Sequence, residues 1–291
     1  MSAAADAAIN DLLADWTTRL RAAEPDAVAI VCRGSFARGE PEPWSDLDLD
    51  LIFDDREIDE YRSAFGPPFV IPDTEADTSA DSDASAQSAP AAPATGTSPP
   101  LHVTIACRTL ADRLREIAEP AESEAWAFFL AAAEPARVVW KHPRVGARLP
   151  DRFAVEYHLA PQLQDLLECA AKIRNARRRD DEPGARLAAR DLAVHVPALV
   201  ALVNPQIRVE TRRQALAVAL GFPDAPPGYR DRILFCLGLS DSGPEDLPDC
   251  AIALARATIA FLTPHAREVA PYLEPGLAEA LADGTVSRVL G

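Results

Sequence analysis

Two patterns of hydrophobic residues divide the chain. In the first part, apolar residues come in short runs, and in one run they alternate strictly with polar residues. Such runs predict β-strands, because successive side chains of a strand point to opposite faces of the sheet. A helix is predicted before them at 2–22, where apolar residues recur at helical spacing. The predicted strands are 27–33, 46–53, 101–107 and 136–141.

Helices alone are predicted in the second part, from residue 151 to the C-terminus. Apolar residues recur there at intervals of three and four, which places them on one face of each helix. Pro197 is expected to bend the second of these helices. We therefore predict an α+β fold, with a small mixed-sheet domain at 1–146 and an all-α bundle of five or six helices at 147–291. The predicted helices are 159–173, 187–203, 209–220, 228–238, 247–262 and 275–283.

Four other segments of the first domain show less regular patterns. Residues 54–65 are expected to form a short helix or turn, and a helix capped by Thr109 is expected to run to residue 118. Another helix is expected after Glu122. Residues 72–100 contain no aromatic residue and no Leu, Ile or Val. Since such a segment buries too little apolar surface to offset its ordering entropy, we interpret it as a disordered acidic insertion, with a lid over a ligand as the alternative.

The stretch from Gly34 to Asp50 holds the candidate chemistry. It reads Gly-Ser-Phe-Ala-Arg-Gly from Gly34 and Ser-Asp-Leu-Asp-Leu-Asp from Ser45. Gly34 permits a tight turn after the first strand, and the N–H groups there, with the Ser35 hydroxyl, can contact phosphate oxygens. In the second strand the aspartates share one face, because side chains along a strand alternate.

Asp46, Asp48 and Asp50 would repel one another on this face, and burying their charges without a partner would be costly. A divalent cation is the usual solution, and Mg2+ commonly takes one or two carboxylates together with substrate phosphates. We therefore predict that Asp46 and Asp48 hold Mg2+, with a two-metal site as an option. Asp50 is expected to support these two residues or to be exposed.

Gly-Ser, a spacer and Ser-Asp-Leu-Asp-Leu together resemble the motif of the nucleotidyltransferases of the DNA polymerase β superfamily. Within this superfamily, the motif sequence is most similar to those of the minimal nucleotidyltransferases and the aminoglycoside adenylyltransferases. The resemblance implies that Gly34 and Ser35 bind nucleotide phosphates, and that Asp46 and Asp48 bind Mg2+. The implied reaction moves a nucleoside monophosphate from a nucleoside triphosphate, with ATP as the first choice, to a hydroxyl of a small-molecule acceptor, and releases pyrophosphate.

His102 stands in the predicted strand 101–107, where the resemblance implies a third carboxylate. In the family that carboxylate helps to bind a second metal or deprotonates the acceptor hydroxyl. A neutral imidazole can accept a proton near pH 7, so His102 is the candidate base. Two alternatives stay open: another residue such as Glu156 is the base, or transfer is lost and only nucleotide binding is kept. Arg38 and Ser45 are further candidates for contacts with the phosphates.

Composition narrows the partners and the compartment. The 291 residues carry a net charge of −16 at pH 7, which argues against general nucleic-acid binding because such binding needs a basic surface. The five cysteines show no CxxC spacing, so we expect buried, reduced thiols in a reducing compartment. The sequence shows neither a signal peptide nor an apolar run of membrane-spanning length, so a cytoplasmic protein without membrane contact is expected.

Features of the helical part leave other functions open. Arg190 and His195 resemble the Arg-x4-His motif of HEPN ribonucleases, which are often paired with minimal nucleotidyltransferases. The basic run from Lys172 to Arg179 is expected to be a solvated helix end, with an anion site as the alternative. The main alternative function is an antitoxin-like or regulatory module that nucleotidylates a protein partner or only binds it.

Overall fold

The chain forms two compact units in the computed structural model. The first combines Met1–Glu119 with Glu134–Val155, and the second combines Pro120–Ala133 with Glu156–Gly291. The first unit thus extends beyond residue 146, where the sequence pattern placed a boundary, because the strand that follows still pairs in the sheet. The structure describes residues 3–42, 45–54, 60–69, 100–122, 127–241 and 246–290.

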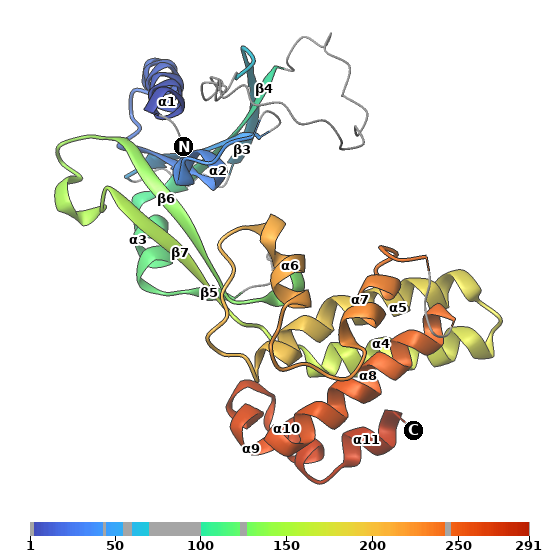
Figure 1. The fold of residues 1–291 in the computed structure, drawn as a ribbon. Helices are drawn as coiled ribbons and strands as arrows, with labels where there is room; N and C mark the ends of the chain where they lie inside the picture. The colour runs from blue at the N-terminus through green and yellow to red at the C-terminus, as the bar shows by residue number, and fades with distance from the viewer. Residues whose placement is uncertain are drawn as a thin grey trace, which may run out of the picture. The chain divides into compact units, whose positions relative to one another are not determined.

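In the described part of the chain, seven strands form one mixed sheet: β1 Ala29–Arg33, β2 Leu47–Phe53, β3 Glu60–Gly66, β4 Leu101–Thr109, β5 Ala121–Glu122, β6 Ala132–Lys141 and β7 Arg152–His158. The strand order is β3-β4-β2-β1-β6-β7-β5 (Figure 1). β2 runs parallel to β4 and antiparallel to β1. The prediction of an α+β fold with a mixed sheet is confirmed.

Helices cover the two faces of this sheet: α1 Ala3–Ala23, α2 Gly34–Arg38 and α3 Leu110–Ala118. Leu49 and Trp16 belong to the core between the sheet and α1. Ile52 and Leu110 belong to the core on the opposite face, against α3. Leu49 faces α1. Because successive side chains of a strand alternate, Asp48 lies on the opposite face, the one that α3 covers in part.

The predicted Thr109 cap is confirmed. The Asp112 amide donates a hydrogen bond of 3.0 Å to Thr109 Oγ1, and α3 ends at Ala118. The helix expected after Glu122 is wrong for the residues that the structure describes. Ala127–Phe129 form a single 3-10 turn, and φ is positive at Phe128 and Phe129, which a regular helix does not allow.

Two strands were not expected from the sequence. β3 occupies part of the segment predicted as helix or turn, and β7 lies where only helices were predicted. Exposure alternates along β3, as at Tyr61, Ser63 and Phe65, whereas along β7 it alternates only from Val155 onward. Each strand is short and makes its hydrogen bonds with a neighbouring strand, which its own sequence does not reveal. Helical spacing and strand alternation were therefore hard to tell apart in these two segments. Most of the predicted insertion at 72–100 lies outside the described residues.

The second unit is helical apart from β5 and the ends of β6 and β7. Its core surrounds α5 and α8 and contains Ala193, Val196 and Ile259. Pro197 lies inside α5, as predicted. Leu247–Tyr272 are apolar and long enough to cross a membrane by length and composition alone, yet α8 within them packs against α5. The helices are α4 Leu163–Arg178, α5 Glu182–Ala201, α6 Ala215–Leu220, α7 Tyr229–Cys236, α8 Leu247–Leu262, α9 Ala266–Val269, α10 Pro275–Ala282 and α11 Thr285–Leu290.

Candidate active site

β1 and β2 bring the glycine-serine turn and the aspartates together. Arg33, the last residue of β1, is the partner of Asp48 in the register of the two antiparallel strands. Gly34 follows at once and begins α2 with φ at +65°, a left-handed conformation that favours glycine. A Cβ atom at Gly34 would lie 2.8 Å from Oδ2 of Asp48. The absence of a side chain therefore allows the turn to approach the carboxylate.

Asp48 carries a charge that the fold compensates only in part, through Arg33. Its side chain is half-buried at the start of β2, and Asp46 is exposed just before the strand. Burial, followed by the charge of Asp46, raises the pKa of the Asp48 carboxyl to about 6, although Arg33 acts in the opposite direction. Two hard oxygen ligands with excess negative charge suit a cation such as Mg2+. The residues present therefore fit the predicted metal.

Further ligands for such a cation are not supplied by a preformed cluster. Among the residues that the structure describes, no group of three or more His, Cys, Asp and Glu side chains is arranged to hold a metal ion. A cation between Asp46 and Asp48 would therefore need oxygen atoms from a bound molecule or from water. Mg2+ in proteins commonly has this kind of coordination.

Asp50 is buried, so of the two expectations for it, support of the other aspartates or exposure, exposure is wrong. Its side chain has 0% exposure and contacts the guanidinium of Arg113 of α3, which is 2% exposed. Arg33 Nε lies 3.1 Å from the same oxygen of Asp50, and Arg113 Nη1 lies 2.7 Å from Glu116. The guanidinium groups of Arg33 and Arg113 thus both hold Asp50, and the contact with Arg113 anchors β2 to α3.

Glu134 adds an acidic group that the sequence reasoning did not select. It lies in β6, and its carboxylate is 3.4 Å from Arg33 Nη1. Its charge also contributes to the raised pKa of Asp48. Arg33 therefore lies among three carboxylates of the same sheet face. Nothing in the local sequence around Glu134 indicates this, because 101 residues separate it from Arg33.

His102 lies at the start of β4, one residue before Val103, the partner of Leu47. This register places His102 near the end of β2 where Asp46 lies. The imidazole packs beside Phe65 of β3, with ring centroids 5.3 Å apart, and Phe65 itself is 69% exposed. The structure thus places the predicted base on the strand next to the aspartates, beside an exposed aromatic ring.

Ser45 and Arg38 have local partners. The Ser45 hydroxyl accepts a hydrogen bond of 2.8 Å from the Glu42 amide. Arg38, the last residue of α2, lies 3.6 Å from Glu40, a carboxylate that is 69% exposed. The Arg38 side chain itself is only 16% exposed, so it is mostly covered at the end of α2.

The Arg190 and His195 pair does not form a shared site. Arg190 is exposed on α5, whereas the half-buried His195 ring stacks on Phe129 with centroids 5.2 Å apart. Burial lowers the pKa of His195, which favours the neutral imidazole. Glu156 lies in β7 rather than opening a helix, and its carboxylate is 3.3 Å from Arg208. The separate environments of Arg190 and His195 do not favour a nuclease.

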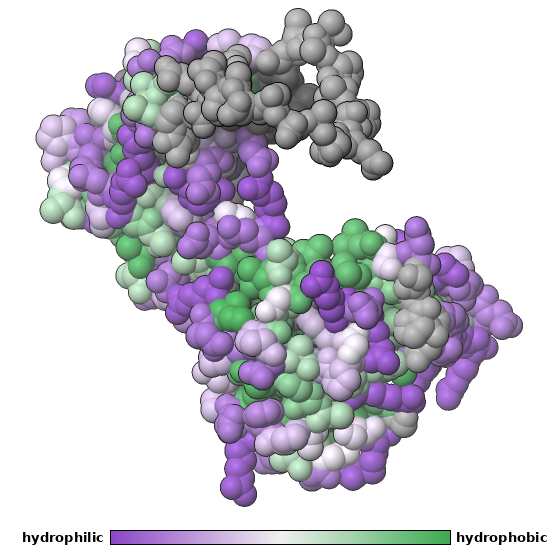
Figure 2. Space-filling view, in the orientation of Figure 1, coloured by the Kyte–Doolittle hydropathy of each residue, from purple (hydrophilic) through white to green (hydrophobic). Residues whose placement is uncertain are grey.

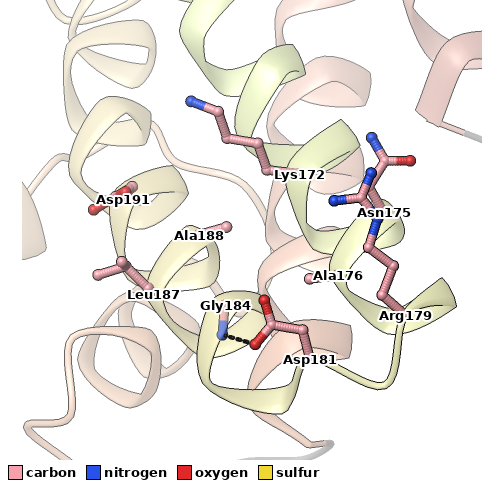
Figure 3. Close-up of a pocket in the computed structure, with 9 residues that line it drawn as sticks. All are labelled: Lys172, Asn175, Ala176, Arg179, Asp181, Gly184, Leu187, Ala188 and Asp191. Atoms are coloured by element: carbon pink, nitrogen blue, oxygen red, sulfur yellow. Dashed lines mark hydrogen bonds between the residues drawn. The ribbon is translucent and has the colours of Figure 1, made fainter.

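The basic run at the end of α4 is mostly occupied by acidic and carbonyl partners. Arg177 pairs with Asp246 and Asp249, and Lys172 lies 2.9 Å from Glu168. Hydrophilic side chains gather at this end of the unit (Figure 2). The groove between α4 and α5 mixes charges, because Lys172, Arg179, Asp181 and Asp191 all line it (Figure 3). This mixture favours the solvated helix end over an anion site.

Comparison with known proteins gives one match to a family. Residues 162–261 match the model described as "Nucleotidyltransferase, substrate binding domain". A crystal structure of a nucleotidyltransferase-like protein from Exiguobacterium sibiricum 255-15 is 11% identical, with a TM-score of 0.41, and the similarity covers 94% of this chain and 80% of that chain. No curated protein matches the chain.

Proposed function

We propose, from the premise that the chain resembles nucleotidyltransferases in its motif and in its matched substrate-binding domain, that it catalyses nucleotidyl transfer. The donor is a nucleoside triphosphate, with ATP as the first choice, and the acceptor is a hydroxyl of a small molecule. The observation that carries the proposal is the close approach of Gly34 to the Asp48 carboxylate. This approach supports the proposal because the turn at Gly34 would bind phosphate beside the aspartates that would hold the cation.

Each residue of the motif has a role in this proposal. Asp46 and Asp48 would hold Mg2+, which when bound neutralises developing charge on the phosphates. The backbone N–H groups at Gly34 and Ser35, with the Ser35 hydroxyl, bind the β- and γ-phosphates. Arg38 contacts the same phosphates, since a guanidinium matches their geometry.

In the reaction, the acceptor oxygen forms a bond to the α-phosphorus while the bond from that phosphorus to the β-phosphate oxygen breaks. Pyrophosphate leaves on the side opposite to the attacking oxygen. His102 accepts the proton that the hydroxyl loses, as a neutral imidazole can near pH 7. Arg33, held by Asp50 and Glu134, keeps a fixed positive charge beside Asp48.

Calorimetric titration tests the nucleotide site directly. ATP, GTP, CTP and UTP are titrated into the protein with Mg2+, and the Asp46→Asn/Asp48→Asn protein serves as the control. We expect one nucleotide to bind only when both the metal and the aspartates are present. Equal binding by the double variant would contradict the assignment, and an acceptor screen follows the positive result.

Gly34→Ala tests the turn. The new methyl group must displace the Asp48 carboxylate, so we expect nucleotide binding to weaken about tenfold or more. The alanine must also keep the left-handed backbone conformation of Gly34, so we expect the free energy of unfolding to fall by about 1–2 kcal/mol. Gly146→Ala is the matched control, because Gly146 has φ at +55° with no atom within 4 Å of an added Cβ. Unchanged affinity of Gly34→Ala in the titration would show that the turn does not contact the nucleotide.

A second candidate function follows from the composition of β4. His102 replaces the carboxylate that the family resemblance implies, and β4 contains no Asp or Glu. A regulatory, antitoxin-like module that binds nucleotide, or modifies a protein partner, would tolerate this change. Nucleotide binding without transfer to any tested small molecule, together with modification of a co-purifying protein, would favour this function over the first.

A further inference from the structure

A pocket of about 260 Å³ lies within the second unit, on residues to which the transfer mechanism proposed above assigns no role. Its walls come from the end of β7, the end of α5 and the loop that follows α5. They are mixed: Leu159, Leu202, Pro205 and Ile207 are apolar lining residues, and Glu156, His158 and Arg208 are polar ones. Concave sites with apolar walls and a few convergent polar groups are the usual form of small-molecule sites. The volume is slightly below the range of about 300–1,000 Å³ for drug-sized ligands, which indicates a smaller molecule.

The polar groups of the pocket carry opposite charges. Glu156 Oε2 lies 3.3 Å from Arg208 Nη1, and the two side chains are 49% and 57% exposed. An exposed ion pair of this kind contributes little to stability, so each partner can exchange the other for a ligand at small cost. A carboxylate and a guanidinium side by side match a ligand whose ammonium and carboxylate groups are also adjacent.

We propose that this pocket binds a zwitterionic small molecule with an apolar body, which is the chemistry of an α-amino acid with a large apolar side chain. Glu156 binds the ammonium group, Arg208 binds the carboxylate in a two-pronged contact, and the body of the ligand lies against Leu159 and Ile207. Tyr272, which is 57% exposed, also lines the pocket and closes over the ring or chain. The inference goes beyond the proposed transfer, because all these residues belong to the second unit.

Binding of defined probes tests the proposal. L-Phenylalanine and L-leucine are titrated into the full-length protein by calorimetry, and glycine tests the need for an apolar body. Phenethylamine lacks the carboxylate, and 3-phenylpropionate lacks the ammonium group. We expect L-phenylalanine or L-leucine to bind, and each probe that lacks one charged group to bind about tenfold more weakly.

Variants assign the two charges. Glu156→Gln should weaken the binding of L-phenylalanine and phenethylamine but not that of 3-phenylpropionate. Arg208→Gln should weaken the binding of L-phenylalanine and 3-phenylpropionate but not that of phenethylamine. Glu182→Gln and Arg186→Gln are matched controls, because these residues form another exposed ion pair of the same unit, 2.7 Å apart. The controls should leave binding unchanged.

Three outcomes would overturn the proposal: no binding of either amino acid at millimolar concentration, equal binding of phenethylamine and L-phenylalanine, or binding that neither pocket variant alters. The nucleotide titration and its aspartate control test a site made of residues of the first unit only. Failure of amino-acid binding therefore leaves nucleotidyl transfer intact, and failure of nucleotide binding leaves this pocket intact.

Discussion

Asp48→Asn is expected to slow nucleotide transfer by about a thousandfold, because several kcal/mol of charge stabilisation depend on the metal that this carboxylate holds. The same change is expected to leave the protein as stable as the wild type or more stable. In the folded protein the Asp48 charge is partly buried and repelled by Asp46, so its pKa is raised to about 6. A neutral side chain of the same shape removes that cost. Activity and stability should therefore change in opposite directions.

Two measurements on the same sample check this prediction. Initial rates with the identified nucleotide and acceptor give the loss of activity, and urea unfolding gives the stability. Asp151→Asn is the matched control, since Asp151 loses the same charge at a position that is 83% exposed in the same unit. Full activity of Asp48→Asn would show that Asp48 does not hold the metal. Loss of activity together with unfolding would show only that Asp48 is needed for the structure.

Arg113→Leu is expected to lower the free energy of unfolding of the first unit by about 3 kcal/mol. The change removes one of the two cations that hold the buried Asp50 carboxylate, and Arg33 alone stays within 3.1 Å. Breaking a buried ion pair leaves an under-compensated charge, which costs far more than the pair itself contributes.

A control and a double variant separate this mechanism from simple loss of packing. Arg115→Leu changes a neighbouring arginine of α3 that is 64% exposed and pairs with Asp112, so it should cost about 0–1 kcal/mol. Asp50→Leu combined with Arg113→Leu should recover much of the lost stability, because no buried charge remains opposite the removed cation. A double variant as unstable as Arg113→Leu would show that the charge on Asp50 is not the cause.

The sequence predicted the motif well because its geometry is local. Gly34 directly follows β1 and Asp48 lies in β2, the next strand along the chain, and alternation alone places Asp48 and Asp50 on one face. The different environments of these two aspartates were not predictable. Asp50 is buried because Arg113, 63 residues away, reaches it from α3. No local pattern marks such a pair.

Elements that depend on partners were the least predictable. β3 and β7 are strands because neighbouring strands accept and donate their hydrogen bonds, and neither sequence alone separates a strand from a helix or turn. Glu134 and the pocket beside Glu156 likewise arise from segments distant in sequence. The helices of the second unit were predicted more successfully, since helical hydrogen bonds are internal and each apolar stripe spans several turns.

The buried cysteines give the protein a reporter of its own opening. Cys32 and Cys107 lie in the sheet core of the first unit, and Cys169, Cys236 and Cys250 lie in the helical unit. Burial raises the pKa of the Cys32 thiol to about 12, which suppresses the reactive thiolate. A thiol reagent therefore modifies these residues only in molecules whose unit has opened. Labelling rates read by peptide mapping would time the opening of each unit separately, without a dye or an engineered residue.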